Sequence, residues 1–189
     1  MPWLTAFYDA CVLYPAPLRD LLVNLAIVGP FQAKWTLQVQ EEWVRSLLEN
    51  RPDLKRERLE RTCALMNRSV RECLVTDYES LIPALTLPDL DDRHVLAAAI
   101  VVRADVIVTF NLADFPALAL QPHGIIAQHP DDFIRGQLDS APEAVLLALW
   151  EQRDGLTNPP KTAAELLDTL EKQGLHETVA HLRRFSLFL

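Results

Sequence analysis

Short apolar runs alternate with longer stretches of helical spacing along residues 1–139. The apolar runs predict strands at residues 3–8, 31–35, 73–76, 105–110 and 124–127. The apolar positions between them recur at helical spacing and predict helices at residues 18–28, 37–49, 52–71, 78–85, 92–103 and 130–138. Strands alternating with helices indicate an α/β fold with a central parallel sheet and helices on both faces.

The pattern changes after about Ser140. Helical spacing recurs over residues 141–151, 162–172 and 175–184, and Thr162 and Glu165 have the spacing of a capping box. We therefore expect an α/β domain at residues 1–139 and an all-helical extension at residues 140–189. The apolar end of the chain, residues 185–189, is expected to pack against the body of the protein, with contact to a partner as the alternative.

Composition excludes several classes of protein. Half of the 189 residues are hydrophobic, which favours a globular fold over disorder. The three cysteines have no CxxC spacing, so neither a zinc site nor a disulfide framework is expected. No apolar run has the length of a membrane span, and the N-terminus lacks the basic region of a signal peptide. We expect a cytoplasmic protein.

The charge is unevenly distributed. The whole chain carries a net charge of −8, but residues 51–71 hold seven basic and three acidic side chains, a net charge of +4. This segment is either a basic face for RNA or for a partner, or a solvated helix stabilised by pairs such as Glu57 with Arg61. Residues 141–189 hold five Lys or Arg and seven Asp or Glu, which argues against a DNA-binding tail.

Acidic residues at the edges of apolar runs are the strongest chemical signal. They are Asp9, Glu42, Asp92 and Asp114. The ends of parallel strands meet at one edge of a sheet, where ligands bind. Carboxylates gathered there repel one another, and a divalent cation allows them to stay ionised together. The pattern therefore indicates a metal-dependent enzyme.

Each of these residues also has an ordinary structural interpretation. Glu41 competes with Glu42 for the inner face of its helix. Asp91 could share or replace the role of Asp92, which could simply cap the helix that follows it. Asp114 could be a cap residue at a turn. These alternatives stay open at the level of the sequence.

Four segments together resemble PIN-domain ribonucleases, especially the VapC-like toxins of bacterial toxin–antitoxin pairs. They are residues 7–15, 35–42, 91–99 and 108–116, and the resemblance covers roughly residues 4–138. It implies an α/β/α sandwich with a parallel sheet and Mg²⁺ or Mn²⁺ at a carboxylate cluster. The helical tail is similar to an extension found on a subset of such toxins.

The resemblance also assigns roles to residues. Asp9, Glu42, Asp92 and Asp114 would form the acidic quartet, with Asn111 and Thr109 in support. Asp9 and Asp92 would make the nearest metal contacts, while the other two acids would bind a second ion or orient water.

Two positions near the quartet are less clear. Many members have Asn, Ser or Thr where this chain has Cys11, and a thiol is a poor hydrogen-bond partner for a carboxylate. His94 lies beside the acidic loop, but on an apolar helix we expect it to serve packing.

The function that this resemblance implies is that of a metal-dependent endoribonuclease, the toxin of a toxin–antitoxin pair, which hydrolyses phosphodiester bonds in tRNA or rRNA. A cognate antitoxin and a homodimer are expected partners. Two alternatives remain: a metal-dependent phosphoesterase that acts on a substrate other than RNA, and a non-catalytic RNA- or partner-binding module.

Overall fold

The computed structural model describes residues 3–184, and within them four parallel strands form one sheet in the order β2-β1-β3-β4. The strands are β1 (Leu4–Tyr8), β2 (Phe31–Lys34), β3 (Val106–Val108) and β4 (Ile126–Gln128). Residues 6–8 and 106–108 are buried, which explains why these central strands appear as continuous apolar runs. The α/β fold with a central parallel sheet is confirmed.

The strand predicted at residues 73–76 was wrong. This segment lies within the described chain and joins no strand of the sheet, although Leu74 forms an isolated parallel bridge with Trp35. Glu72 and Asp77, on either side of the segment, have φ values of 52° and 63°. These left-handed conformations turn the chain at both ends, so the extended segment is too short to pair further.

The described chain forms two compact units, one that contains residues 3–14 and 31–129 and one that contains residues 15–30 and 130–184. This grouping differs from the expected division at residue 139, because helix α2 (Ala16–Val28) belongs with the C-terminal helices. The division into domains at residues 1–139 and 140–189 stays a prediction.

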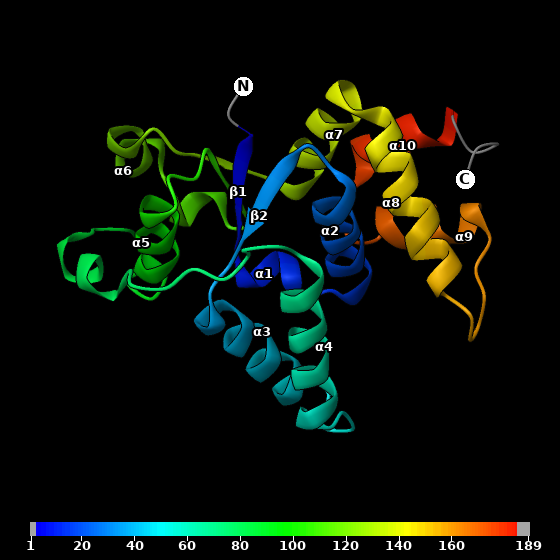
Figure 1. Cartoon of the computed structure of the whole chain (residues 1–189), viewed down its shortest axis with the longest axis horizontal. Helices are drawn as coiled ribbons and strands as arrows, with labels where there is room; N and C mark the ends of the chain where they lie inside the picture. Colours follow the sequence, from blue (N-terminus) through cyan, green and yellow to red (C-terminus); the bar gives the residue numbers. More distant parts are fainter. Residues whose placement is uncertain (1–2, 185–189) are drawn as a thin grey trace. The chain divides into compact units, whose positions relative to one another are not determined.

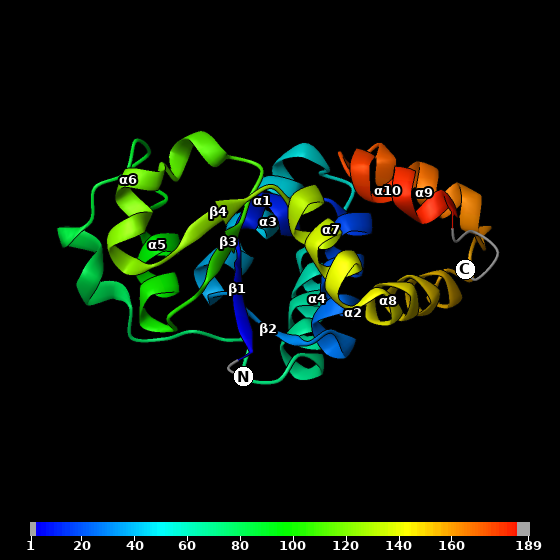
Figure 2. The ribbon, with the colours of Figure 1, turned by 90° about the horizontal axis from the view of Figure 1, so that it is seen from above.

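The first unit contains the sheet and the helices that follow its strands. They are α1 (Ala10–Leu13), α3 (Leu37–Asn50), α4 (Arg56–Ser69), α5 (Arg93–Val101) and α6 (Ala117–Leu120), with the 3-10 segments η1 (Glu79–Ala84), η2 (Leu112–Asp114) and η3 (Gln121–His123). Figures 1 and 2 show α5 on one side of β1, and α3 with α4 on the other.

Helix α3 begins where the sequence indicated. The hydroxyl of Thr36 accepts a hydrogen bond from the Val39 amide at 3.0 Å, as an N-cap residue does. Val39, Trp43 and Val44 are buried, and this apolar stripe sets which face of the helix turns inward.

The second unit is helical. It contains α2, α7 (Pro130–Ser140), α8 (Pro142–Gly155), α9 (Ala163–Glu171) and α10 (His176–Leu182). The predicted capping box of Thr162 and Glu165 is present at the start of α9. The prediction for residues 185–189 lies outside the described residues. Within residues 3–184, no helix is both long and apolar enough to cross a membrane.

Candidate active site

A pocket of about 420 Å³ opens in the first unit where β1, α3 and the loop before α5 meet. Its walls carry four carboxylates, from Asp9, Glu42, Asp91 and Asp92. Asn111 is also on the wall. The structure therefore brings together acids that are separated by more than eighty positions in the sequence, as the topology of the sheet led us to expect.

The carboxylate of Asp9 is held in place at both oxygens. Its Oδ1 accepts a hydrogen bond from the Ala10 amide at 2.6 Å, and its Oδ2 accepts one from the Thr109 hydroxyl at 2.7 Å. Strand register explains the second contact: Tyr8 pairs with Val108, so the residues that follow them are neighbours. Asp9 is only 5% exposed and makes these contacts in place of water.

Cys11 takes part in the same network. Its Sγ lies 3.0 Å from Asp9 Oδ2 and accepts a hydrogen bond from the Phe110 amide at 3.2 Å. Burial, and then the negative charge of Asp9, raises the pKa of this thiol. The thiol therefore stays protonated and can donate to the carboxylate, so a cysteine at this position still supports Asp9.

Of the two supporting residues, Asn111 lines the pocket and Thr109 does not. Thr109 is fully buried behind the pocket wall, and its hydroxyl also accepts a hydrogen bond from the Asn111 amide at 2.9 Å. Asn111 is exposed and lines the pocket. The hydroxyl thus links Asp9 to the turn that presents the Asn111 side chain.

Two neighbouring glutamates on α3 face different surroundings. Glu42 lines the pocket, whereas Glu41 forms a two-pronged ion pair with Arg56 of α4, with both N–O distances at 3.0 Å. The sequence left these two acids as alternatives. The packing of α3 turns Glu42 toward the other carboxylates.

Asp92 stands at the N-cap position of α5, but its side chain makes no capping hydrogen bond. Asp92 thus occupies the cap position that the sequence suggested but does not act there through its carboxylate, which lines the pocket instead. Burial, and then the nearby charges of Asp9, Asp89 and Asp114, raises the pKa of Asp92 to about 7. The pKa is therefore raised first by the loss of water around the carboxyl and then by repulsion from the neighbouring acids.

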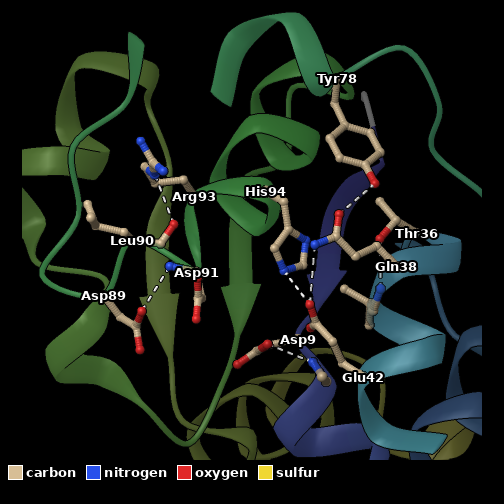
Figure 3. Close-up of polar contacts among 12 residues, drawn as sticks. Asp9, Thr36, Gln38, Glu42, Tyr78, Asp89, Leu90, Asp91, Arg93 and His94 are labelled. Carbon is tan, nitrogen blue, oxygen red and sulfur yellow. Dashed lines mark hydrogen bonds and ion pairs between the residues drawn. The ribbon is translucent and has the colours of Figure 1, made fainter. Parts of the chain in front are cut away.

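The remaining acids lie around Asp92. Asp91 is exposed on the pocket wall, and its amide donates to Asp89 Oδ1 at 2.8 Å (Figure 3). Asp114 ends the 3-10 segment η2 and is not among the residues lining the pocket. Its charge nevertheless acts on Asp92, so it lies within electrostatic reach of the site.

His94 makes a contact that the sequence did not reveal. It is 3% exposed, and its Nε2 lies 2.9 Å from Glu42 Oε1, as Figure 3 shows. We expected this histidine to serve packing. Its place next to Asp92 was the only signal in the sequence, and the contact depends on how α5 lies against α3.

The donor set of the pocket suits a hard divalent cation. Carboxylate and amide oxygens are the ligands that Mg²⁺ prefers. Within residues 3–184, no three His, Cys, Asp or Glu side chains converge tightly enough to enclose an ion.

Comparison with known proteins agrees with this geometry. Residues 5–113 match the family described as PIN domain, and residues 130–184 match the family described as VapC50 C-terminal domain. Over 96 residues the chain is 48% identical to the protein named "Putative ribonuclease VapC50" of Mycobacterium tuberculosis (strain ATCC 25618 / H37Rv).

That alignment covers 51% of this chain and 56% of the relative, so the chain matches only about half of the curated relative's length. No solved structure matches the chain. The PIN match spans more than half of the chain and contains the pocket acids. The chain therefore belongs to the PIN domain family, in a VapC-like arrangement with a helical C-terminal extension.

Proposed function

We propose that this chain is a divalent-metal-dependent endoribonuclease and the toxin of a toxin–antitoxin pair. The observation that carries the proposal is the pocket of a PIN domain in which Asp9, Glu42 and Asp92 come together from three separate elements. The M. tuberculosis relative is named a ribonuclease, which favours RNA as the substrate.

Asp9 and Asp92 would hold Mg²⁺ or Mn²⁺, while Glu42 and Asp114 would orient its water ligands or bind a second ion. Such an ion supplies an activated water and neutralises charge on the phosphodiester. The raised pKa of Asp92 supports this assignment, because burial, its largest cause, and the neighbouring negative charges both disfavour the ionised carboxyl, and a bound cation would favour it.

The protein's own groups supply positioning. Asp9 is fixed by hydrogen bonds to both of its oxygens, so little side-chain freedom remains to be lost when it acts. Arg45 lines the same pocket, and its guanidinium can pair with a phosphate of the RNA backbone. Asn111, on the wall, can donate to the same backbone.

The proposed substrate is tRNA or rRNA, because proteins read RNA sequence mainly in unstacked loops. A cognate antitoxin would block the pocket, and a homodimer is part of the proposal. Arg58, Arg61 and Arg68 are exposed along α4 and form a basic surface suited to RNA phosphates.

Cleavage of total tRNA and of a defined RNA hairpin by the purified full chain tests this function. Reactions would contain Mg²⁺, Mn²⁺ or EDTA, beside the Asp92→Asn variant. We expect cleavage that requires a divalent ion and is lost in the variant.

Intact RNA under every condition would overturn the proposal. Cleavage of DNA or of a small phosphoester without cleavage of RNA would indicate a different phosphoesterase. RNA binding that neither needs metal nor leads to cleavage would indicate a binding module.

A further inference from the structure

The imidazole of His94 and the carboxylate of Glu42 form a buried contact between α5 and α3. His94 Nε2 lies 2.9 Å from Glu42 Oε1, and the histidine side chain is 3% exposed. Within residues 3–184, the other ring nitrogen, Nδ1, is buried and has no hydrogen-bond partner. The Glu42 contact is thus the polar interaction that accounts for an imidazole at this position.

Packing alone does not explain this residue. A buried polar atom without a partner costs free energy, and a leucine of similar volume would avoid that cost. The neighbours of His94 on α5, residues 95–99, are apolar and buried, so the site could accept such a side chain.

A second donor reaches the same oxygen of Glu42. Gln38 lies one turn earlier on α3, and its Nε2 is 3.4 Å from Glu42 Oε1. Gln38 is in turn fixed by the Tyr78 hydroxyl, which donates to its Oε1 at 3.3 Å. Figure 3 shows Gln38 and His94 meeting at this oxygen of Glu42, with the Tyr78 hydroxyl in contact with Gln38.

The second carboxylate oxygen of Glu42, Oε2, has none of these donors. Within the described chain, Oε2 makes no hydrogen bond or ion pair, and Glu42 lines the pocket. Both donors therefore occupy Oε1 and leave Oε2 as the oxygen available to the pocket.

We propose that His94 is a positioning residue, which holds Glu42 through Oε1 so that the carboxylate acts in the pocket through Oε2 alone. The inference rests on the proposed function, because it takes the pocket to bind a divalent ion and its waters. A glutamate has several rotatable bonds, and groups that hold such a side chain from behind tune metal sites. An Nε2 proton provides this contact whatever the state of Nδ1.

The test compares His94→Gln with His94→Leu in the full chain. The glutamine places an amide N–H near the position of Nε2, whereas the leucine fills the volume without a donor. Mn²⁺ binding is measured by calorimetry, and kcat and KM for RNA cleavage are measured separately. We expect His94→Leu to weaken Mn²⁺ binding or lower kcat about 10- to 100-fold with little change in KM, and His94→Gln to recover most of the loss.

Gln40→Leu is the matched control. Gln40 is also on α3 and buried, and its amide exchanges hydrogen bonds with Asn67 at 2.9 and 3.0 Å, away from Glu42. It reports the effect of losing a buried polar pair without disturbing the carboxylate. The inference is overturned if His94→Leu binds Mn²⁺ and cleaves like the wild type, if it only matches Gln40→Leu, or if glutamine rescues nothing.

Failure of this inference can be told from failure of the proposed function. A wild-type protein that cuts no RNA refutes the nuclease, while the Mn²⁺ affinities of the variants still decide the role of His94. A wild-type protein that cuts no RNA and binds neither Mg²⁺ nor Mn²⁺ refutes both.

Discussion

The hydroxyl of Thr109 donates to Asp9 Oδ2 at 2.7 Å and joins the ends of two adjacent strands across one hundred positions of sequence. Thr109→Val keeps the shape of the side chain and removes the hydroxyl. It removes one of the two donors to Asp9 Oδ2, so that only the Cys11 thiol remains at this oxygen, and it takes away the hydroxyl that accepts from the Asn111 amide. We expect unfolding to become easier by about 1–3 kcal/mol, with reduced RNA cleavage. Urea unfolding and cleavage assays measure both, and Thr109→Ser should stay close to wild type. Equal losses in the two variants would contradict this account.

The raised pKa of Asp92 predicts how stability depends on pH in the absence of metal. The folded state has a pKa of about 7 at this carboxyl, against 3.8 for the ordinary group. Between these values the folded protein holds a proton that the unfolded chain releases, so the contribution of Asp92 to stability falls as pH rises. Above the pKa of the folded state, the contribution of Asp92 to stability no longer changes with pH.

Thermal unfolding in EDTA at a series of pH values measures this dependence. Asp92→Asn cannot ionise at this position and should lack the loss of stability that Asp92 causes as pH rises. The melting temperature of the variant should therefore exceed that of the wild type by a margin that grows as pH rises toward neutrality. Mg²⁺ should then stabilise the wild type at pH values above about 7 more than the variant. If the melting temperatures of the two proteins changed with pH in parallel, Asp92 would not have a raised pKa in the folded state.

Glu41 and Glu42 offer a matched pair of substitutions on one helix. Glu42→Gln removes a charge from the pocket and should lower RNA cleavage by at least about tenfold. Glu41→Gln breaks an exposed ion pair with Arg56, which contributes little, and cleavage should stay within about twofold of wild type. The rates of RNA cleavage by the two variants decide which glutamate acts in the pocket. A larger loss for Glu41→Gln than for Glu42→Gln would assign that role to Glu41.

In the helical unit, Asp131 acts as the cap of a helix that is distant in sequence. Its two carboxylate oxygens accept hydrogen bonds from the amides of Glu177 and Thr178, at 2.8 and 2.9 Å, in the first turn of α10. Asp131→Ala leaves these buried donors unpaired and should cost about 1–3 kcal/mol of stability. Asp132→Ala removes the next, exposed acid and serves as control. Indistinguishable unfolding midpoints would contradict the capping role.

Local pattern was enough to place most elements and to mark the edge of the sheet where the acids gather. The alternation of strands and helices, the N-cap at Thr36 and the capping box at Thr162 depend on neighbours within a few positions, so the sequence shows them directly. Asp9 directly follows β1, so the rule that parallel strand ends share an edge places it at the pocket, whereas Asp92 precedes α5 and its position depends on how that helix packs.

The tertiary structure decided what depends on distant contacts. The rotation of α3 separates Glu42 from Glu41, and the approach of α5 to α3 gives His94 its carboxylate partner. The backbone turns at Glu72 and Asp77 remove the strand that the apolar run suggested. Periodicity tells which residues share a face of an element, but which partner meets that face is set by packing among elements far apart in the sequence.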